Sequence, residues 1–141
     1  MRLLGLDAGE KTIGVAVCDE EQMVATPLRT LPRHGGRKDV EAVAAVLAET
    51  GARALVMGLP LELSGREGDA ARKARALGTL LARGLDDIEV HYWDERFSTV
   101  SAERVLIQAD MSRKKRKKVV NHLAACIILQ GYLDRGAEVA P

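Results

Sequence analysis

A carboxylate followed closely by a glycine stands directly after the first apolar run of the chain. Asp7 follows Leu3–Leu6, and Gly9 comes two residues later. A carboxylate at the end of a buried strand is poorly solvated and rigidly held, while the glycine lets a phosphate or a metal ion approach the backbone. Oxygen ligands of this kind bind hard divalent cations, which polarise phosphates and activate water. The alternative is an aspartate that only shapes a turn between two strands.

An acidic pair and an arginine follow a later apolar segment and form a second candidate site. Adjacent carboxylates at the end of a strand point to opposite sides, so we expect only one of Asp94 and Glu95 to face the site. We favour Glu95 as the inward ligand, with Asp94 as a second ligand or as a hydrogen-bond acceptor in the loop. Arg96 is able to pair with a substrate phosphate through two parallel hydrogen bonds. The alternative is a salt-bridge cluster of these three residues where a helix begins.

The loop at 58–65 follows the apolar segment Ala54–Gly58, which we predict to be a strand, and it carries an additional carboxylate, Glu62. In α/β proteins the loops after the strands often build the functional site, so Glu62 is a third candidate. The alternative is a solvated glutamate without a specific role.

An unbroken run of six cations precedes the last apolar segment of the chain. Its members are Arg113, Lys114, Lys115, Arg116, Lys117 and Lys118. Such a run binds a nucleic-acid backbone by releasing counterions, whereas cations at the N-terminus of a helix oppose its dipole. We therefore expect these residues to contact phosphates, together with Lys11 in the first turn. The alternative is a solvated loop and helix start.

Two polar residues, Asn121 and His122, open the apolar segment directly after the basic run. The side-chain oxygen of Asn121 could bind a metal ion, and His122 could carry a proton or bind metal. The alternative for both is an exposed turn of helix.

The elements that must position these residues alternate between strands and helices. The predicted strands are Leu3–Leu6, Ile13–Cys18, Met23–Leu31, Ala54–Gly58 and Ile88–Trp93. The predicted helices are Asp39–Glu49, Gly68–Ala82, a short one capped by Ser98 or Thr99 and reaching Ile107, and a last one from the basic run to Gly136. The first two strands read as a hairpin, and Pro27 and Pro32 place the third at a sheet edge. We expect an α/β fold with a mixed sheet flanked by helices.

Composition excludes several classes of protein. A length of 141 residues suits one domain over 1–141, and a formal net charge of +1 means that any affinity for nucleic acid must be local. An aromatic content of 3% argues against a base-stacking platform. Cys18 and Cys126 lie far apart, which excludes a disulfide framework and fits a reducing cytoplasm. No segment has the length and apolar character of a signal peptide or a membrane span.

Four ordered motifs together resemble a known family. They are LDAGEKTIGVA at 6–16, VMGLPL at 56–61, DERFSTVSA at 94–102 and AACIILQGYL at 124–133. The chain resembles the YqgF/RuvX family, bacterial proteins with an RNase H-like fold that are related to the RuvC Holliday junction resolvases. The resemblance implies a nuclease with a five-stranded mixed sheet, and it identifies Asp7, Asp94 and Glu95 with the acidic residues of the family site.

Two positions depart from the family pattern. The final-helix acid of the family falls on Asn121, and the common GLPLNMDG loop has glutamate at Glu62 in place of asparagine. Two-metal hydrolysis needs enough negative charge to hold two cations about 4 Å apart. We therefore weigh three outcomes: a neutral ligand from Asn121 or His122, a replacement carboxylate from Glu62, or a weakened site. In RuvC-type enzymes the second acid follows the fourth strand, which supports Glu62 by resemblance.

The leading expectation is an endonuclease that depends on Mg²⁺ or Mn²⁺ and acts on structured nucleic acid. The resemblance implies processing of the 5′ end of pre-16S ribosomal RNA, with resolution of Holliday junctions in branched DNA as the alternative. A resolvase is expected to work as a two-fold homodimer. A catalytically degenerate binder stays open because of Asn121. A nucleotide-binding fragment also stays open, because Asp7–Gly14 resembles the first phosphate loop of actin-like ATPases and sugar kinases.

Overall fold

The chain forms one five-stranded sheet with helices on both faces. A computed structural model describes residues 1–97 and 113–135, with side chains in the last helix described from Leu123 onward. The strands are β1 (Leu3–Ala8), β2 (Thr12–Cys18), β3 (Ala25–Pro32), β4 (Ala54–Leu59) and β5 (Glu89–Asp94). The helices are α1 (Gly36–Thr50), α2 (Asp69–Gly84), the 3₁₀ turn η1 (Glu95–Phe97) and α4 (Arg113–Arg135). The expected short helix through Ile107 lies outside the described residues.

The strand order is β3-β2-β1-β4-β5, which makes β1 the centre of the sheet. β1 is antiparallel to β2 and β2 to β3, whereas β4 runs parallel to both β1 and β5. The mixed sheet expected from the sequence is therefore confirmed, and so is the edge position of the proline-containing third strand. The C-terminal ends of β1, β4 and β5 meet at one edge, where parallel sheets commonly place their sites.

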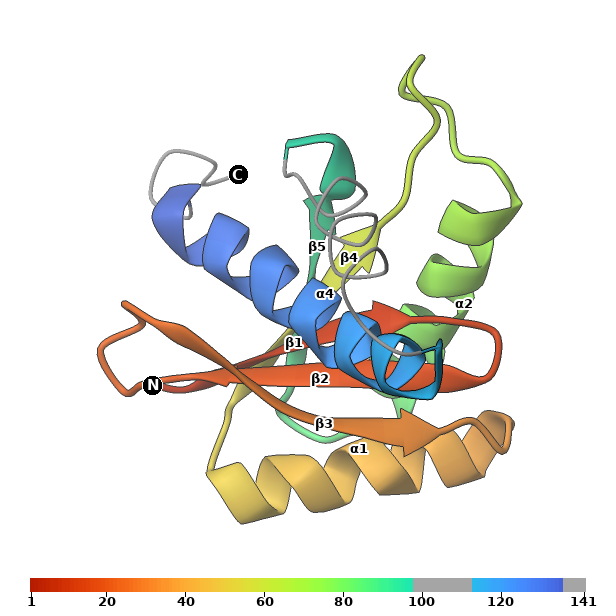
Figure 1. Ribbon diagram of the computed structural model, residues 1–141. Coiled ribbons are helices and arrows are strands. Elements are labelled where there is room, and N and C mark those ends of the chain that lie inside the picture. The colour runs from red at the N-terminus through yellow and green to blue at the C-terminus, as the bar shows by residue number, and fades with distance from the viewer. Residues whose placement is uncertain (98–112, 136–141) are drawn as a thin grey trace.

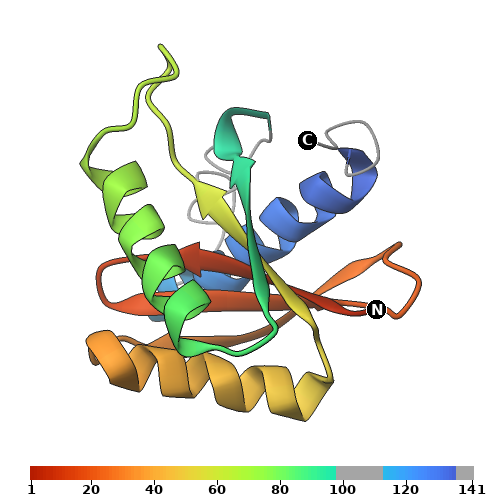
Figure 2. The same cartoon turned by 180° about the vertical axis from the view of Figure 1, so that it is seen from behind.

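Side chains alternate between two cores, one on each face of the sheet. Leu4 and Leu6 of β1 and Met57 of β4 lie in the core beneath α1 and α2. Leu3 of β1 and Val56 of β4 lie in the other core, which α4 covers. Figure 1 shows α4 lying across its face, and Figure 2, turned by 180°, shows α1 and α2 on the opposite side.

α4 approaches the sheet closely because β1 has a glycine beneath it. A Cβ at Gly5 would lie 2.6 Å from Cβ of Leu129 and 2.7 Å from the carbonyl oxygen of Ala125. Gln130 fixes the same helix to the edge of the sheet: its Oε1 accepts from the Ala25 N–H at 2.9 Å, and its Nε2 donates to the Met23 carbonyl at 3.0 Å. The C-terminal half of α4 therefore has a defined position over β1.

Several element boundaries differ from the sequence prediction, and three of these differences have a clear local reason. β1 continues to Ala8, so Asp7 lies inside the strand, because the hairpin ladder pairs it with Gly14. α1 begins at Gly36, three residues before Asp39, because its first turn carries no apolar residue for the periodicity to detect. β3 begins at Ala25, because the Asp19 carboxylate accepts hydrogen bonds from the amides of the two preceding residues and holds them in a turn.

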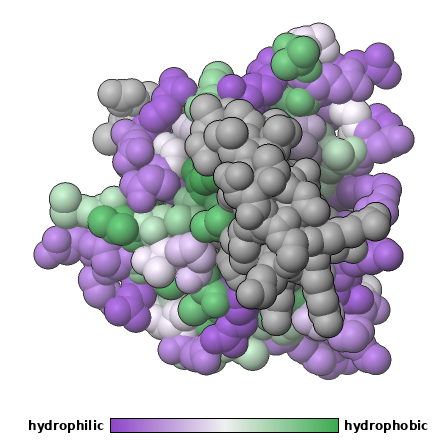
Figure 3. All heavy atoms as spheres, viewed as in Figure 1, coloured by the Kyte–Doolittle hydropathy of each residue, from purple (hydrophilic) through white to green (hydrophobic). Residues whose placement is uncertain are grey.

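The surface of the α4 face is mainly hydrophilic at its margin, with hydrophobic side chains in scattered patches (Figure 3). Within the described part of the chain, no helix combines the length and the apolar character needed to cross a bilayer. Cys18 and Cys126 are both free thiols, as their sequence separation predicts.

Candidate active site

Asp7 lies on the α4 face of the central strand. Leu6 belongs to the core under α1 and α2, so the alternation of the strand turns Asp7 to the other side, with Leu3 and Gly5. The parallel register pairs Leu6 with Met57, and the next position brings Asp7 beside Gly58 of β4. The side chain is half-buried at the end of the sheet where β4 also ends.

Glu95 reaches the same place from the other side of β4. It is the first residue of η1, which follows directly after β5, and Gly58 pairs with Trp93 of that strand. Oε2 of Glu95 lies 2.9 Å from the position that a Cβ at Gly58 would occupy. Ile128 of α4 also packs against that position. The carboxylate of Glu95 is therefore turned inward, between the sheet and α4.

Asp7 and Glu95 thus lie on the two sides of Gly58, Asp7 in β1 and Glu95 in the turn that follows β5. Because Gly58 has no side chain, Ile128 and the carboxylate of Glu95 occupy the place that a Cβ there would need. Among the described residues no group of three or more His, Cys, Asp and Glu side chains is arranged to hold a metal ion. A pair of carboxylates is nevertheless enough for Mg²⁺, which commonly takes one or two of them together with substrate phosphates and water.

Asp94 has a different environment from its neighbour. Its carboxylate receives hydrogen bonds from Nε of Arg96 at 3.0 and 3.1 Å and from the Arg96 backbone N–H at 2.9 Å. These hydrogen bonds from Arg96 lower the pKa of Asp94 more than its partial burial raises it. Nη1 of Arg96 donates to the Leu63 carbonyl at 3.2 Å, which ties the end of β5 to the loop after β4. The ion-pair alternative is therefore present for Asp94 and Arg96.

Glu62 lies in the segment that joins β4 to α2 and projects from the body of the protein (Figure 1). Its backbone closes a turn, because its N–H donates to the Arg66 carbonyl at 2.9 Å and its carbonyl accepts from the Gly65 N–H at 2.8 Å. Its carboxylate is exposed, with Oε1 2.9 Å from where a Cβ at Gly68 would lie. Gly68 caps the N-terminus of α2, so Glu62 extends toward that helix.

The remaining candidates divide between two parts of the chain. Lys11 is exposed in the turn between β1 and β2, and its carbonyl accepts from the Arg33 backbone N–H at 2.8 Å. The six cations of the basic run form the first turns of α4, as the helix prediction required, and Asn121 and His122 follow in the same helix. The side chains of these eight residues lie outside the described part of the structure.

Gly58 is a site residue that sequence reasoning missed. It lies in the VMGLPL motif, where the sequence alone indicates only the end of a strand. Its role depends on Glu95 and Ile128, which reach it from distant parts of the chain. The available signal is a glycine near the end of a fully buried strand, next to the strand that carries the candidate carboxylate Asp7.

Comparison with known proteins gives a family and close relatives. The family model described as "RuvX: Holliday junction resolvase" matches residues 1–135. A protein of Cereibacter sphaeroides named "Putative pre-16S rRNA nuclease" is 50% identical over 133 residues, which cover 94% of this chain and 82% of the relative. A protein of the same name from Clostridioides difficile is 47% identical over 133 residues, covering 94% of both chains.

Solved structures give the same fold at low sequence identity. RuvC of Thermus thermophilus in complex with a Holliday junction substrate matches with a TM-score of 0.59 and 15% identity, over 96% of each chain. The fowlpox virus resolvase in complex with Holliday junction DNA matches with a TM-score of 0.60 and 11% identity, over 99% of this chain and 100% of the resolvase. The fold is therefore the RNase H-like fold of these resolvases.

Proposed function

The chain belongs to the RuvX family, and from that premise we propose that it is an endonuclease that hydrolyses phosphodiester bonds in structured nucleic acid with the help of a divalent cation. The observation that carries the proposal is the pair of carboxylates at Asp7 and Glu95, on the two sides of Gly58 and under α4. Processing of pre-16S ribosomal RNA is the leading role, because relatives with 47–50% identity carry that name.

The donor set fits a hard divalent cation, since both inward groups are carboxylates and no described cysteine or histidine accompanies them. When bound, such a cation polarises a phosphate and lowers the pKa of water. Asp7 and Glu95 would hold it. Both Mg²⁺ and Mn²⁺ accept oxygen ligands, so the proposal includes either ion.

A third ligand is proposed from α4. Ile128 packs at Gly58, and Asn121 precedes it by seven residues, which is two helical turns. We assign the amide oxygen of Asn121 to this role and His122 to proton transfer or ligation. Glu62 is the second candidate for the third ligand, although its carboxylate extends toward Gly68.

The proposal divides the nucleic-acid contacts by their surroundings. The basic run and Lys11 would contact backbone phosphates. Such contacts bind the nucleic acid and position it without reading its base sequence. Arg96 uses its guanidinium for Asp94 and for the Leu63 carbonyl, so it is assigned to holding the loop. This assignment replaces the phosphate contact expected from its sequence position.

Resolution of Holliday junctions is the second candidate function. It is favoured by the description of the family model and by the shared fold with two resolvases that were solved with junction DNA. A homodimer is part of this alternative, because symmetrical cutting of two strands requires a two-fold arrangement.

Cleavage of two end-labelled substrates tests both candidates. A pre-16S RNA 5′ leader and a four-way DNA junction would be incubated with the wild type, with Asp7→Asn and with Glu95→Gln, each in Mg²⁺, Mn²⁺ or EDTA. Asp86→Asn is the matched control, because it makes the same chemical change at an exposed position before β5, at the opposite edge of the sheet.

We expect cleavage that requires a divalent cation and falls at least about 100-fold in both site variants. Loss of an outer partner of a metal ligand already costs about 10–100-fold, and loss of a direct ligand should cost no less. The substrate that is cut faster decides between the two roles. Binding without cleavage in every metal would overturn the proposal in favour of a degenerate nucleic-acid binder.

A further inference from the structure

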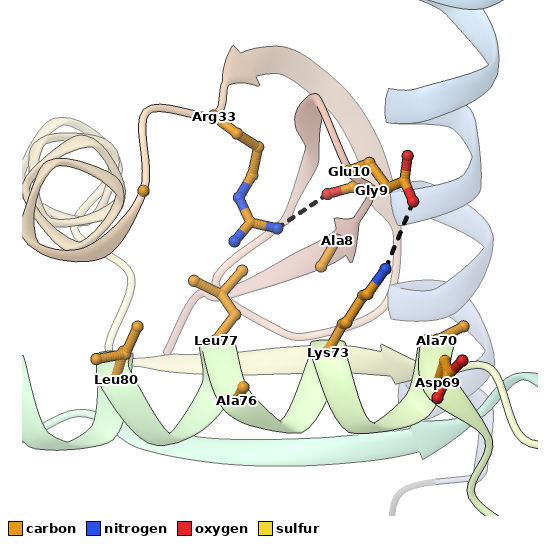
Figure 4. Close-up of a pocket in the computed structure, with 11 residues that line it drawn as sticks. Ala8, Gly9, Glu10, Arg33, Asp69, Ala70, Lys73, Ala76, Leu77 and Leu80 are labelled. Carbon is orange, nitrogen blue, oxygen red and sulfur yellow. Dashed lines mark hydrogen bonds and ion pairs between the residues drawn. The ribbon is translucent and has the colours of Figure 1, made fainter.

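The turn between β1 and β2, directly after Asp7, stands over a cavity. The cavity has a volume of about 690 Å³ and separates this turn from α2. Figure 4 shows Ala8 and Gly9 above it and Leu77 and Ala76 of α2 below. Because cavity and solvent lie beneath the turn, close packing of core side chains does not fix its position.

Polar contacts take the place of packing. Nη1 of Arg33 donates to the Gly9 carbonyl at 2.9 Å, and the Arg33 backbone N–H donates to the Lys11 carbonyl at 2.8 Å. One residue therefore holds the turn at two carbonyl groups. A second contact in Figure 4, between Lys73 and Glu10 at 3.5 Å, joins two exposed side chains and contributes little.

The arginine is itself fixed by a buried carboxylate. Asp39, in the first turn of α1, is 1% exposed, and its Oδ2 accepts from Nε of Arg33 at 3.0 Å. Its other oxygen accepts from the His34 backbone N–H at 2.9 Å. Burial raises the pKa of Asp39, but these hydrogen bonds outweigh it and hold that pKa below its ordinary value. The carboxylate is thus ionised near neutral pH, and its charge offsets that of Arg33.

We propose that Arg33 is a positioning residue for Asp7: it transmits the fixed position of Asp39 in α1 to the β1–β2 turn, and so sets where the last residues of β1 lie. The inference rests on the proposed function, in which Asp7 binds a cation. It assigns Arg33 no contact with substrate, because its charge is already paired with a buried carboxylate.

The forked shape of the Arg33 guanidinium allows it to contact Asp39 and the turn at the same time. Nε serves Asp39 and Nη1 serves Gly9, so both contacts need the planar group. Lysine has a single ammonium group, which is able to keep the ion pair but does not bridge both partners in this geometry. Arg33→Lys therefore removes the connection to the turn while leaving the buried charge compensated.

A matched control exists on the same two elements. Arg29 of β3 also pairs with a carboxylate of α1, Glu49, but near the other end of the helix and away from the turn. Arg29→Lys makes the same substitution in an exposed ion pair, whereas the partner of Arg33 is buried. It therefore controls for the loss of a guanidinium next to α1, and the comparison of Gly9 with Val56 below assigns the effect to the turn.

Two measurements test the inference. The first is amide hydrogen exchange of Gly9, whose N–H donates to the Thr12 carbonyl at 2.8 Å and so reports opening of the turn, with Val56 of β4 as the internal reference. The second is the separation of kcat from KM for cleavage of the faster-cut nucleic acid. We expect Arg33→Lys to raise Gly9 exchange about tenfold with no change at Val56, since a hydrogen bond from a charged donor is lost.

We also expect kcat to fall at least about tenfold while KM changes by less than about twofold, because a misplaced ligand affects the reaction and not substrate capture. Wild-type exchange at Gly9, or an equal rise at Val56, would overturn the inference. A higher KM with unchanged exchange would also overturn it and would make Arg33 a substrate contact. If the wild type cleaves nothing in any metal, the proposed function fails, and the exchange result alone decides whether Arg33 holds the turn.

Discussion

The carboxylate of Glu95 lies directly beside Gly58, with Oε2 2.9 Å from the position that a Cβ there would occupy. The two residues are 37 positions apart in sequence and meet because β4 and β5 are adjacent parallel strands. The glycine therefore has a steric role: it leaves room for a carboxylate between the sheet and α4.

Gly58→Ala should reduce cleavage at least about tenfold. The added methyl group displaces the flexible end of Glu95 and presses on Ile128, so the carboxylate leaves its position. Overpacking of this kind also costs about 1–3 kcal/mol of unfolding free energy. Gly131→Ala is the control, because a Cβ there meets the Trp93 ring at 2.9 Å and is expected to lower stability with little effect on cleavage. Equal cleavage by Gly58→Ala and the wild type would contradict the assigned role of Glu95.

Asp94→Asn should lower stability at neutral pH, and the difference from the wild type should disappear in acid. Because Arg96 lowers the pKa of folded Asp94, the folded pKa lies below the unfolded value of about 3.9. The stabilisation is therefore complete above about pH 5 and is lost as the pH falls through the folded pKa. Urea unfolding between pH 3 and pH 7 measures the difference. A difference that stayed constant down to the lowest pH would rule out the ion pair as its source.

Replacing Lys114, Lys115, Lys117 and Lys118 with glutamine should weaken nucleic-acid binding and flatten its salt dependence. Each phosphate contact that is lost reduces the slope of log K against log salt by about 0.9 for duplex and about 0.7 for single strands. Filter binding at several salt concentrations gives the slope. The control is glutamine at the exposed Arg37 and Lys38 of α1, which should leave the slope unchanged. If the lysine variant had the same salt slope as the wild type and the control, the basic run would not contact phosphates.

Asn121→Asp should tighten divalent-metal binding by about tenfold or more. A full negative charge near a bound cation contributes several kcal/mol even at an effective dielectric constant of about 20. Titration with Mn²⁺ followed by its paramagnetic effect on solvent water measures the affinity without nuclease activity. Affinity equal to that of the wild type would place residue 121 away from the cation.

Glu62→Gln tests whether Glu62, the second candidate for the third metal ligand, binds the cation. Because the Glu62 carboxylate extends toward Gly68, we expect the Mn²⁺ affinity to change by less than about twofold. A loss of about tenfold would show that Glu62 leaves the N-terminus of α2 and binds the cation, as its place in the RuvC-like pattern suggested. The same titration therefore compares Asn121 and Glu62 directly.

The order of the elements could be predicted because each strand or helix has its own apolar pattern, as in Ala54–Leu59, which is buried throughout. The first turn of α1 could not, since Gly36 begins it and Asp39 faces a polar partner. Strand alternation could predict that only one of Asp94 and Glu95 faces inward, but not which one, because that depends on the packing of Glu95 beside Gly58 and Ile128. The roles of Gly58 and Arg33 could not be predicted, because both depend on groups from distant segments that only the folded chain brings together.

The position of α4 also determines when the site can form during synthesis of the chain. Among the described elements α4 alone covers the face that carries Asp7, and it follows every strand in the sequence. During synthesis from the N-terminus the sheet emerges first, with Leu3, Ala54 and Val56 uncovered until α4 leaves the ribosome. The two carboxylates then acquire their lid and the basic run in the same step. The arrangement in which Glu95 packs beside Ile128 therefore forms only after α4 has been synthesised.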